Sequence, residues 1–227
     1  MKLNLQKFKN LVRTTIIDLW EYVIPIWKIS GLFKSIKTKK DLENFIQERS
    51  AHVTQTTLYG YLKTRIGVKY IAMMEDEVFL KSINIAKWNI YMVALADCTF
   101  YVFSYLISEK NLKENDCEET FLKIIENEKN NGLNDEIFDR GKKNFLERIN
   151  NVNFSNYHLN DPFKESGQAL YYWSPIADEL KSLDKKIVLN SIHLKWSLMK
   201  DEFKKLTKDL KFFVSFLNSS FINPHFK

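Results

Sequence analysis

Glycine, proline and cysteine are scarce in this chain of 227 residues. The chain holds 6 Gly and 4 Pro, so few turns can be built from them, which disfavours a many-stranded sheet and favours long helices. The two cysteines, Cys98 and Cys117, form no CxxC pair, and free thiols in a reducing compartment are the expectation. We expect no signal peptide, because Asp18 and Glu21 interrupt the apolar stretch near the N-terminus.

Most of the chain has no excess of positive charge, because the basic residues are concentrated near the N-terminus. The net charge is +6, but residues 1–40 carry +7 and the remaining 187 residues sum to −1. The sequence therefore predicts a basic arm, residues 1–40, and a neutral body, residues 41–227. A neutral body disfavours a broad nucleic-acid interface.

The arm has an amphipathic pattern. Residues 5–24 place apolar side chains at helical spacing, namely Phe8, Val12, Ile16, Leu19 and Val23. Pro25 is expected to end or kink this helix. The arm also carries the docking candidates Trp20, Tyr22, Trp27, Lys28 and Lys34. Trp and Tyr prefer the headgroup level of a membrane, and each lysine adds about 1 kcal/mol of attraction to anionic lipid. Three surfaces could bury the apolar side of this helix: the protein's own bundle, an anionic membrane, or a partner protein.

Five further helices are predicted from apolar periodicity, over residues 39–65, 75–108, 117–128, 135–149 and 184–218. Thr38 and Asp41 have capping-box spacing before the first of them, and Gly67 is a plausible stop after it. Ser174, followed by Pro175, has the pattern of a helix N-cap. Residues 150–162 look irregular. These patterns predict an all-α fold, a single helical bundle of long helices with an amphipathic N-terminal arm.

Two helices carry long apolar seams. The seam of the helix at 75–108 comprises Phe79, Ile83, Ala86, Ile90, Val93, Asp97, Phe100 and Ser104. The seam of the last helix comprises Ile192, Trp196, Met199, Phe203, Leu206, Leu210, Phe213 and Leu217. Residues 89–107 hold one charge, Asp97, in the middle of a stretch long enough to span a membrane. Because a central charge is costly in lipid, a buried core helix is the preferred interpretation.

One polar helix face is the candidate ligand site. Arg49, His52, Thr56 and Tyr59 share a face of the helix at 39–65, and Asp97 lies on the seam of the next helix. If the two meet, Asp97 could orient His52 as a base in a pocket. The competing interpretation is a structural network, with Asp97 paired to a Lys, Arg or Tyr. No metal-ligand spacing, serine-hydrolase motif or phosphate loop is present, so we predict no metal, no cofactor and no catalytic residue.

Three segments carry a resemblance: "TLYGYLKTRIG", "SINIAKWNIYMVALAD" and "YWSPIADELKSLDKKIVLNSI". Together they resemble an uncharacterised protein family of alphaproteobacteria, over about residues 39–217, of which some members are labelled "esterase". The resemblance implies an intracellular bacterial or mitochondrion-like protein. The label implies a hydrolase, but no catalytic residue can be carried over to this chain.

Three function classes follow from these observations. The first is a non-catalytic binding or assembly protein of the cytoplasm that docks on the inner membrane surface, or on a membrane protein complex, through its arm. The second is a small-ligand-binding protein or hydrolase that uses the site around His52 and Asp97. The third is an RNA- or ribosome-associated protein that binds through the lysines of the arm.

Overall fold

The computed structural model describes residues 35–112 and 115–208, and over these ranges every regular element is a helix. The long helices are α3 (Lys39–Ile66), α5 (Glu77–Lys110) and α9 (Asp178–Leu206). The shorter ones are α4 (Tyr70–Met73), α6 (Cys117–Glu128), α7 (Asp135–Ile149) and α8 (Lys164–Trp173), with 3-10 turns η1 (Gly67–Lys69), η2 (Lys129–Asn131) and η3 (Tyr157–Leu159). The predicted all-α bundle is confirmed.

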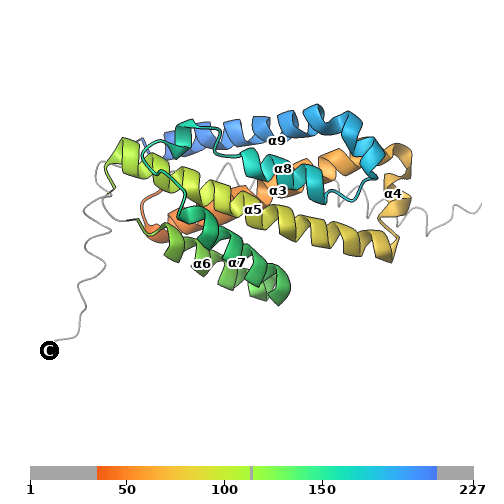
Figure 1. The fold of residues 1–227 in the computed structure, drawn as a ribbon, viewed down its shortest axis with the longest axis horizontal. Helices are drawn as coiled ribbons and strands as arrows, with labels where there is room; N and C mark the ends of the chain where they lie inside the picture. Colours follow the sequence, from red (N-terminus) through yellow and green to blue (C-terminus); the bar gives the residue numbers. More distant parts are fainter. Residues whose placement is uncertain (1–34, 113–114, 209–227) are drawn as a thin grey trace, which may run out of the picture.

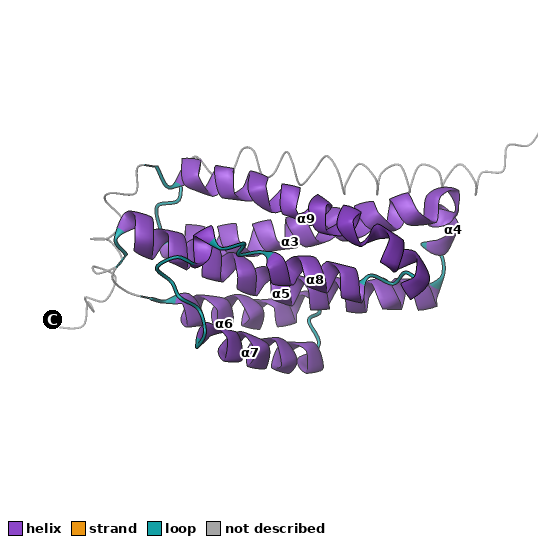
Figure 2. Ribbon diagram, turned by 45° about the horizontal axis from the view of Figure 1, so that its top comes forward, coloured by secondary structure: helices purple, strands orange, loops and turns teal. Residues whose placement is uncertain are grey.

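Helix α5 is the centre of the bundle. It contacts α3 and α8 on one side and α6 and α7 on the other, while α9 packs on α3 and α8 (Figure 1). The long helices run side by side, and α4 makes the turn from α3 to α5 at one end of the bundle (Figures 1 and 2). The two faces of α5 are therefore covered by two different helix groups, and this decides where its polar side chains point.

The predicted helix boundaries of α3 are confirmed by its caps. The Asp41 amide donates to Thr38 Oγ1 at 3.0 Å, and the Thr38 amide donates to Asp41 Oδ2 at 2.9 Å. This reciprocal capping box satisfies two backbone donors that a helix start leaves free. Gly67 ends the helix with a φ of 62°, a value that a residue with a side chain rarely adopts.

The apolar seam of α5 faces the core. Seven of its eight seam positions are buried, and Val93 is half-buried. Among the described helices, α5 alone is long and apolar enough to cross a membrane, and 89% of its most apolar window is buried inside the bundle. The preferred interpretation as a core helix therefore agrees with the packing.

The Ser-Pro signal was interpreted wrongly. Ser174 lies just past the end of α8, where its amide donates to Leu170 O at 3.2 Å and its hydroxyl to the same oxygen at 2.5 Å. Pro175 then stops the chain from continuing as helix, which suits the position after a C-terminus as well as one at an N-terminus. Helix α9 begins three residues later than Pro175, at Asp178, after Ala177.

Helix α8 was not predicted at all, and α9 begins earlier than predicted. Gly167 lies inside α8, where a Cβ atom would be 3.1 Å from Leu189 Cδ2, so this glycine allows α8 to approach α9 closely. Glycine in a ten-residue segment is weak helix material by itself, and the packing overrides that weakness. The last helical residue of α9 is Leu206; the predicted continuation through Leu217 lies outside the described residues from 209 on.

Candidate functional site

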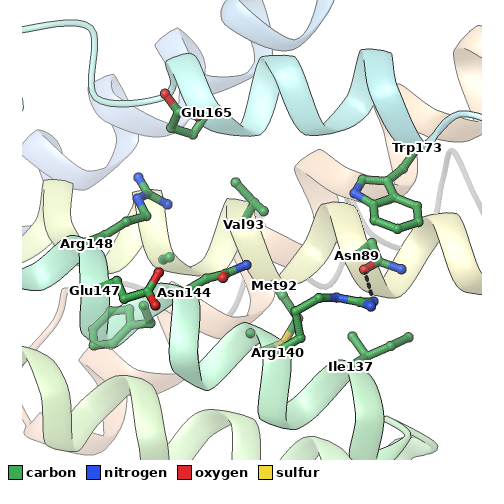
Figure 3. Close-up of a pocket in the computed structure, with 13 residues that line it drawn as sticks. Asn89, Met92, Val93, Ile137, Arg140, Asn144, Glu147, Arg148, Glu165 and Trp173 are labelled. Carbon is green, nitrogen blue, oxygen red and sulfur yellow. Dashed lines mark hydrogen bonds between the residues drawn. The ribbon is translucent and has the colours of Figure 1, made fainter.

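A pocket of about 270 Å³ opens between α5, α7 and α8. Its walls combine apolar side chains with several ionisable ones (Figure 3). The lining residues are Asn89, Met92, Val93, Ala96, Ile137, Arg140, Gly141, Asn144, Phe145, Glu147, Arg148, Glu165 and Trp173. A few polar groups among apolar walls are the usual composition of a small-ligand site, and this volume lies just below the roughly 300–1,000 Å³ of drug-sized pockets.

The floor of the pocket depends on a close approach of α7 to α5. A Cβ atom on Gly141 would lie 2.2 Å from Met92 Cε, 3.3 Å from its Cγ and 3.4 Å from its Cβ. A side chain at position 141 would displace the terminal methyl group of Met92 from its present place. Arg140, directly before Gly141, and Arg148, seven residues after it, both line the pocket from α7.

Arg148 is anchored from below by Asp97. Its Nη2 donates to Asp97 Oδ1 and, at 3.5 Å, to Tyr157 Oη. The other carboxylate oxygen of Asp97 accepts the Ser166 amide at 2.7 Å. Asp97 is 0% exposed, so it would be costly to bury without these donors. The structural alternative for this residue, pairing with a cation, therefore describes the observed contacts.

Burial and pairing act in opposite directions on this ion pair. Burial raises the pKa of Asp97, while Arg148 and Ser166 limit that rise by stabilising the carboxylate. Burial alone would lower the pKa of Arg148, but the Asp97 charge and hydrogen bond raise it. The guanidinium is thus a permanent cation in the pocket wall, since arginine does not deprotonate in proteins.

Arg148 has donors to spare. Nε and Nη1 donate no hydrogen bond to any described residue, and the side chain is 27% exposed along the pocket it lines. Glu165 lies on α8 at the same end of the pocket, and its charge acts on this guanidinium (Figure 3). An anchored cation with free N–H groups next to a carboxylate can hold a ligand that bears both charges.

Arg140 and Trp173 occupy the opposite end of the pocket (Figure 3). Arg140 Nη2 donates to Asn89 Oδ1 at 2.6 Å and Nη1 to Glu136 Oε1 at 3.2 Å. Its guanidinium carbon lies 5.5 Å from the centre of the Trp173 ring. Val93 and Met92 lie between the two ends. The pocket thus has Arg148 and Glu165 at one end, and the Trp173 ring beside the guanidinium of Arg140 at the other end.

The polar face predicted on α3 points toward α9 instead of toward Asp97. Arg49, 2% exposed, donates from Nε and Nη2 to the two carboxylate oxygens of Glu202 at 2.7 and 2.5 Å. Thr56 Oγ1 donates to the His52 carbonyl at 2.8 Å, within its own helix. Tyr59 is half-buried against the core. Arg49 is therefore part of a contact between two helices.

His52 belongs to the same region. It is half-buried, and its Nδ1 is buried without a hydrogen-bond partner among the described residues. Burial, together with the charges of Lys195 and Arg49, lowers the pKa of His52 to about 4. The pairing of His52 with Asp97, predicted as one alternative, is not what the structure contains, because the carboxylate of Asp97 is bound by Arg148 and Ser166.

The docking candidates Trp20, Tyr22, Trp27, Lys28 and Lys34 lie outside the described residues. No group of three or more His, Cys, Asp or Glu side chains that could hold a metal occurs in residues 35–112 and 115–208. Both cysteines are buried free thiols, and burial raises the pKa of Cys98 to about 12. A thiol with so high a pKa is a poor nucleophile.

A serine, a histidine and a glutamate meet elsewhere in the bundle. Ser104 Oγ lies 2.9 Å from His158 Nδ1, and His158 Nε2 lies 3.5 Å from Glu109 Oε1. Ser104 is 0% exposed; its hydroxyl accepts the His158 amide at 3.0 Å and donates to Phe154 O at 2.8 Å. Since its one proton goes to that carbonyl, Nδ1 must be the donor to Ser104. These bonds fasten the segment around η3 onto α5, and no substrate can reach the hydroxyl.

No family model matches the chain, and no curated protein or solved structure matches it. The resemblance to an alphaproteobacterial family therefore stays a prediction. Sequence reasoning found Asp97 but missed Arg148, Glu165 and Trp173. The one signal for Arg148 was indirect: a carboxylate on an apolar seam requires a cationic or hydroxyl partner.

Proposed function

We propose that this protein is a non-catalytic binding protein that takes a free α-amino acid, with an apolar side chain, in the pocket between α5, α7 and α8. The other two predicted function classes depend on the arm, residues 1–40. Small-ligand binding depends instead on the part of the chain that the structure describes, where a pocket is present. The observation that carries the proposal is the pair of nitrogens on Arg148 that donate to no described residue, at the end of the pocket that Glu165 also lines.

The ligand class follows from the presence of one cation and one carboxylate at the same end of the pocket. The carboxylate and ammonium of an α-amino acid sit on one carbon, so their receptors must be neighbours. Arg148 would bind the carboxylate, and Glu165 would bind the ammonium. The side chain would then extend over Val93 and Met92 toward Trp173, where apolar contact adds affinity. Asp97 would act as the group that holds Arg148 in place.

Calorimetry with three matched ligands tests this proposal. Leucine has both charges, N-acetylleucine lacks the ammonium, and leucinamide lacks the carboxylate. We expect leucine to bind in the micromolar to millimolar range, and both derivatives to bind at least tenfold more weakly. Equal binding of leucine and N-acetylleucine would show a plain anion site, and no binding of any of the three would remove the proposal.

A pair of glutamate variants sharpens the test. Glu165→Gln should weaken leucine binding about fivefold, because a partly exposed ion pair contributes about 1 kcal/mol. Its affinity for N-acetylleucine should not change. Glu179→Gln is the matched control, since Glu179 is an exposed glutamate on α9, which contributes no side chain to the pocket.

Docking on an anionic membrane through residues 1–40 is a second proposal, and it excludes any arrangement in which the protein itself covers the apolar side of residues 5–24. Its support is the sequence of the arm, with Trp20, Trp27 and the lysines on an amphipathic segment. Flotation with anionic and neutral vesicles tests it, comparing the full chain with a Lys28→Glu/Lys34→Glu variant. Flotation that requires anionic lipid and is lost in the variant would support it, whereas no flotation of the full chain would contradict it.

A further inference from the structure

Helix α9 is apolar on two sides. Its inner side packs in the core through Val188, Ile192, Trp196, Met199 and Phe203, all of them buried. Its other side carries an outer stripe, defined here as Leu180, Leu183, Ile187, Leu194 and Leu198, which are 43–75% exposed. At 100° per residue these five positions fall within about 60° of one another, on the side away from the core.

A stripe of this kind is unusual for a solvated surface. Single exposed leucines are common and need no explanation, but five large aliphatic side chains on one side of a helix form an apolar stripe, in which about two turns separate Ile187 from Leu194. Spacings of three, four and seven residues are those of a helix that packs against another helix. The outer stripe therefore has the pattern of a contact that the described residues do not complete.

We propose that residues 5–24 of the same chain cover the outer stripe of α9 as a helix. Two apolar stripes of matching length exist in one molecule. The 20 residues of the arm segment would form a helix of about 30 Å, and the 18 helical steps from Leu180 to Leu198 rise about 27 Å. Covering each with the other removes both from water.

The end of the arm is already fastened beside α9. The Ile36 amide donates to the carbonyl of Leu206 at 3.3 Å, and Ile36 is 1% exposed. A parallel arrangement needs the linker from residue 25 to 35 to reach from Leu198 to Leu206, about 12 Å. An antiparallel one would need about 39 Å, close to the full extension of those residues. The arm is therefore expected to lie parallel to α9.

The linker, residues 25–35, also favours the arm of the same chain over a second copy of the chain as the partner of the outer stripe. A short linker gives an effective concentration in the millimolar range, so an intramolecular partner outcompetes an identical intermolecular one at micromolar protein. The proposal is independent of the amino-acid pocket, because α9 contributes no side chain to the lining of that pocket.

Limited trypsin digestion of the full chain, followed by mass spectrometry, tests the arm directly. Residues 1–34 contain six trypsin sites, of which three lie in the segment 5–24 and report on its protection, namely Lys7, Lys9 and Arg13. We expect slow cleavage in the unmodified protein and at least tenfold faster cleavage in the variant Leu183→Glu/Ile187→Glu. The matched control is Ser182→Glu/Lys186→Glu, which places two glutamates on the same turns outside the stripe and should leave the rate unchanged. Circular dichroism verifies that the bundle remains folded in each variant.

Oligomeric state and vesicle binding supply the outcomes that would overturn the proposal. Equal cleavage rates in the unmodified protein and the stripe variant would show that the arm does not lie on the stripe. A dimer by light scattering that the stripe variant converts to a monomer would assign the stripe to a second copy. Protection of the arm that arises only with anionic vesicles would assign it to lipid. A monomer with a protected arm, lost only in the stripe variant, confirms the proposal.

Discussion

Two ion pairs that join helices of this bundle, each with one fully buried member, are built in opposite ways. In the pair between α5 and α7, the anion is the buried member: Asp97 is 0% exposed and its partner Arg148 is 27% exposed. In the pair between α3 and α9, the cation is the buried member: Arg49 is 2% exposed and its partner Glu202 is 32% exposed. Each pair therefore has one member that water reaches and one that it does not.

The difference matters because the two buried members respond differently to the loss of a partner. A buried carboxylate can take up a proton and become neutral, so part of its penalty depends on pH. A guanidinium stays protonated in proteins and must find another acceptor or move toward water. The exposed member also differs: Arg148 presents spare donors to a pocket, whereas both carboxylate oxygens of Glu202 are occupied by Arg49. One pair can serve a ligand, and the other joins two helices.

Removal of Arg148 should have the largest effect on stability. Arg148→Met keeps the length of the side chain but leaves Asp97 buried without its cation. Breaking a buried pair in this way costs about 3–5 kcal/mol. We expect the free energy of unfolding in urea to fall by that amount at pH 7, together with loss of amino-acid binding.

The pH dependence of that loss separates an ion-pair effect from a packing effect. Without Arg148, the pKa of Asp97 rises further, so the folded state binds a proton that the unfolded chain at the same pH does not. Stability of the variant should therefore recover as the pH falls from 7 to 5, and its deficit relative to the unmodified protein should shrink. A deficit of the same size at both pH values would show that packing, and not the charge of Asp97, explains the loss.

Neutralising Glu202 should cost less. Glu202→Gln keeps a hydrogen-bond acceptor beside Arg49 but removes the charge-assisted pair, and Glu202 is the partly exposed member. We expect a loss of about 1–3 kcal/mol by urea unfolding at pH 7. Because the Arg49 guanidinium does not titrate, this deficit should not shrink at pH 5. If the stability deficit of Glu202→Gln were smaller at pH 5 than at pH 7, the two ion pairs would not differ in their pH dependence.

Most helix positions and bounds could be predicted from local sequence patterns. The seams of α5 and α9 repeat every three or four residues, and Thr38, Asp41 and Gly67 mark the ends of α3, so the physical signals are local and strong. Helices α6 and α7 have the predicted bounds. The failures lie at Ser174 and α8, where one Ser-Pro pattern is compatible with either end of a helix and tertiary packing decides.

The site was predictable only in part, because its geometry depends on long-range contacts. Asp97 stood out since a carboxylate on an apolar seam requires a partner. The identity of that partner could not be read, because α5 has two faces and the sequence does not say which helix covers each. The polar face of α3 was found correctly, but α9 covers it, so Arg49 is joined to Glu202, 153 residues away.

The smallest effect is expected at His52, beside the second ion pair. Burial and nearby cations lower the pKa of His52 to about 4, below its ordinary value of 6.5. The unfolded chain therefore binds more protons between pH 6.5 and 4, and stability is lost as the pH falls through this window. After allowance for the partial exposure of the ring, this amounts to about 1 kcal/mol between pH 7 and 5.

His52→Gln should reduce the stability loss on acidification by that amount, measured by urea unfolding at both pH values. The exposed His193 on α9 provides the control, His193→Gln, which should leave the loss unchanged. If His52→Gln behaves like the control, then the ring is solvated in solution, and the cations of the α3–α9 contact do not act on it.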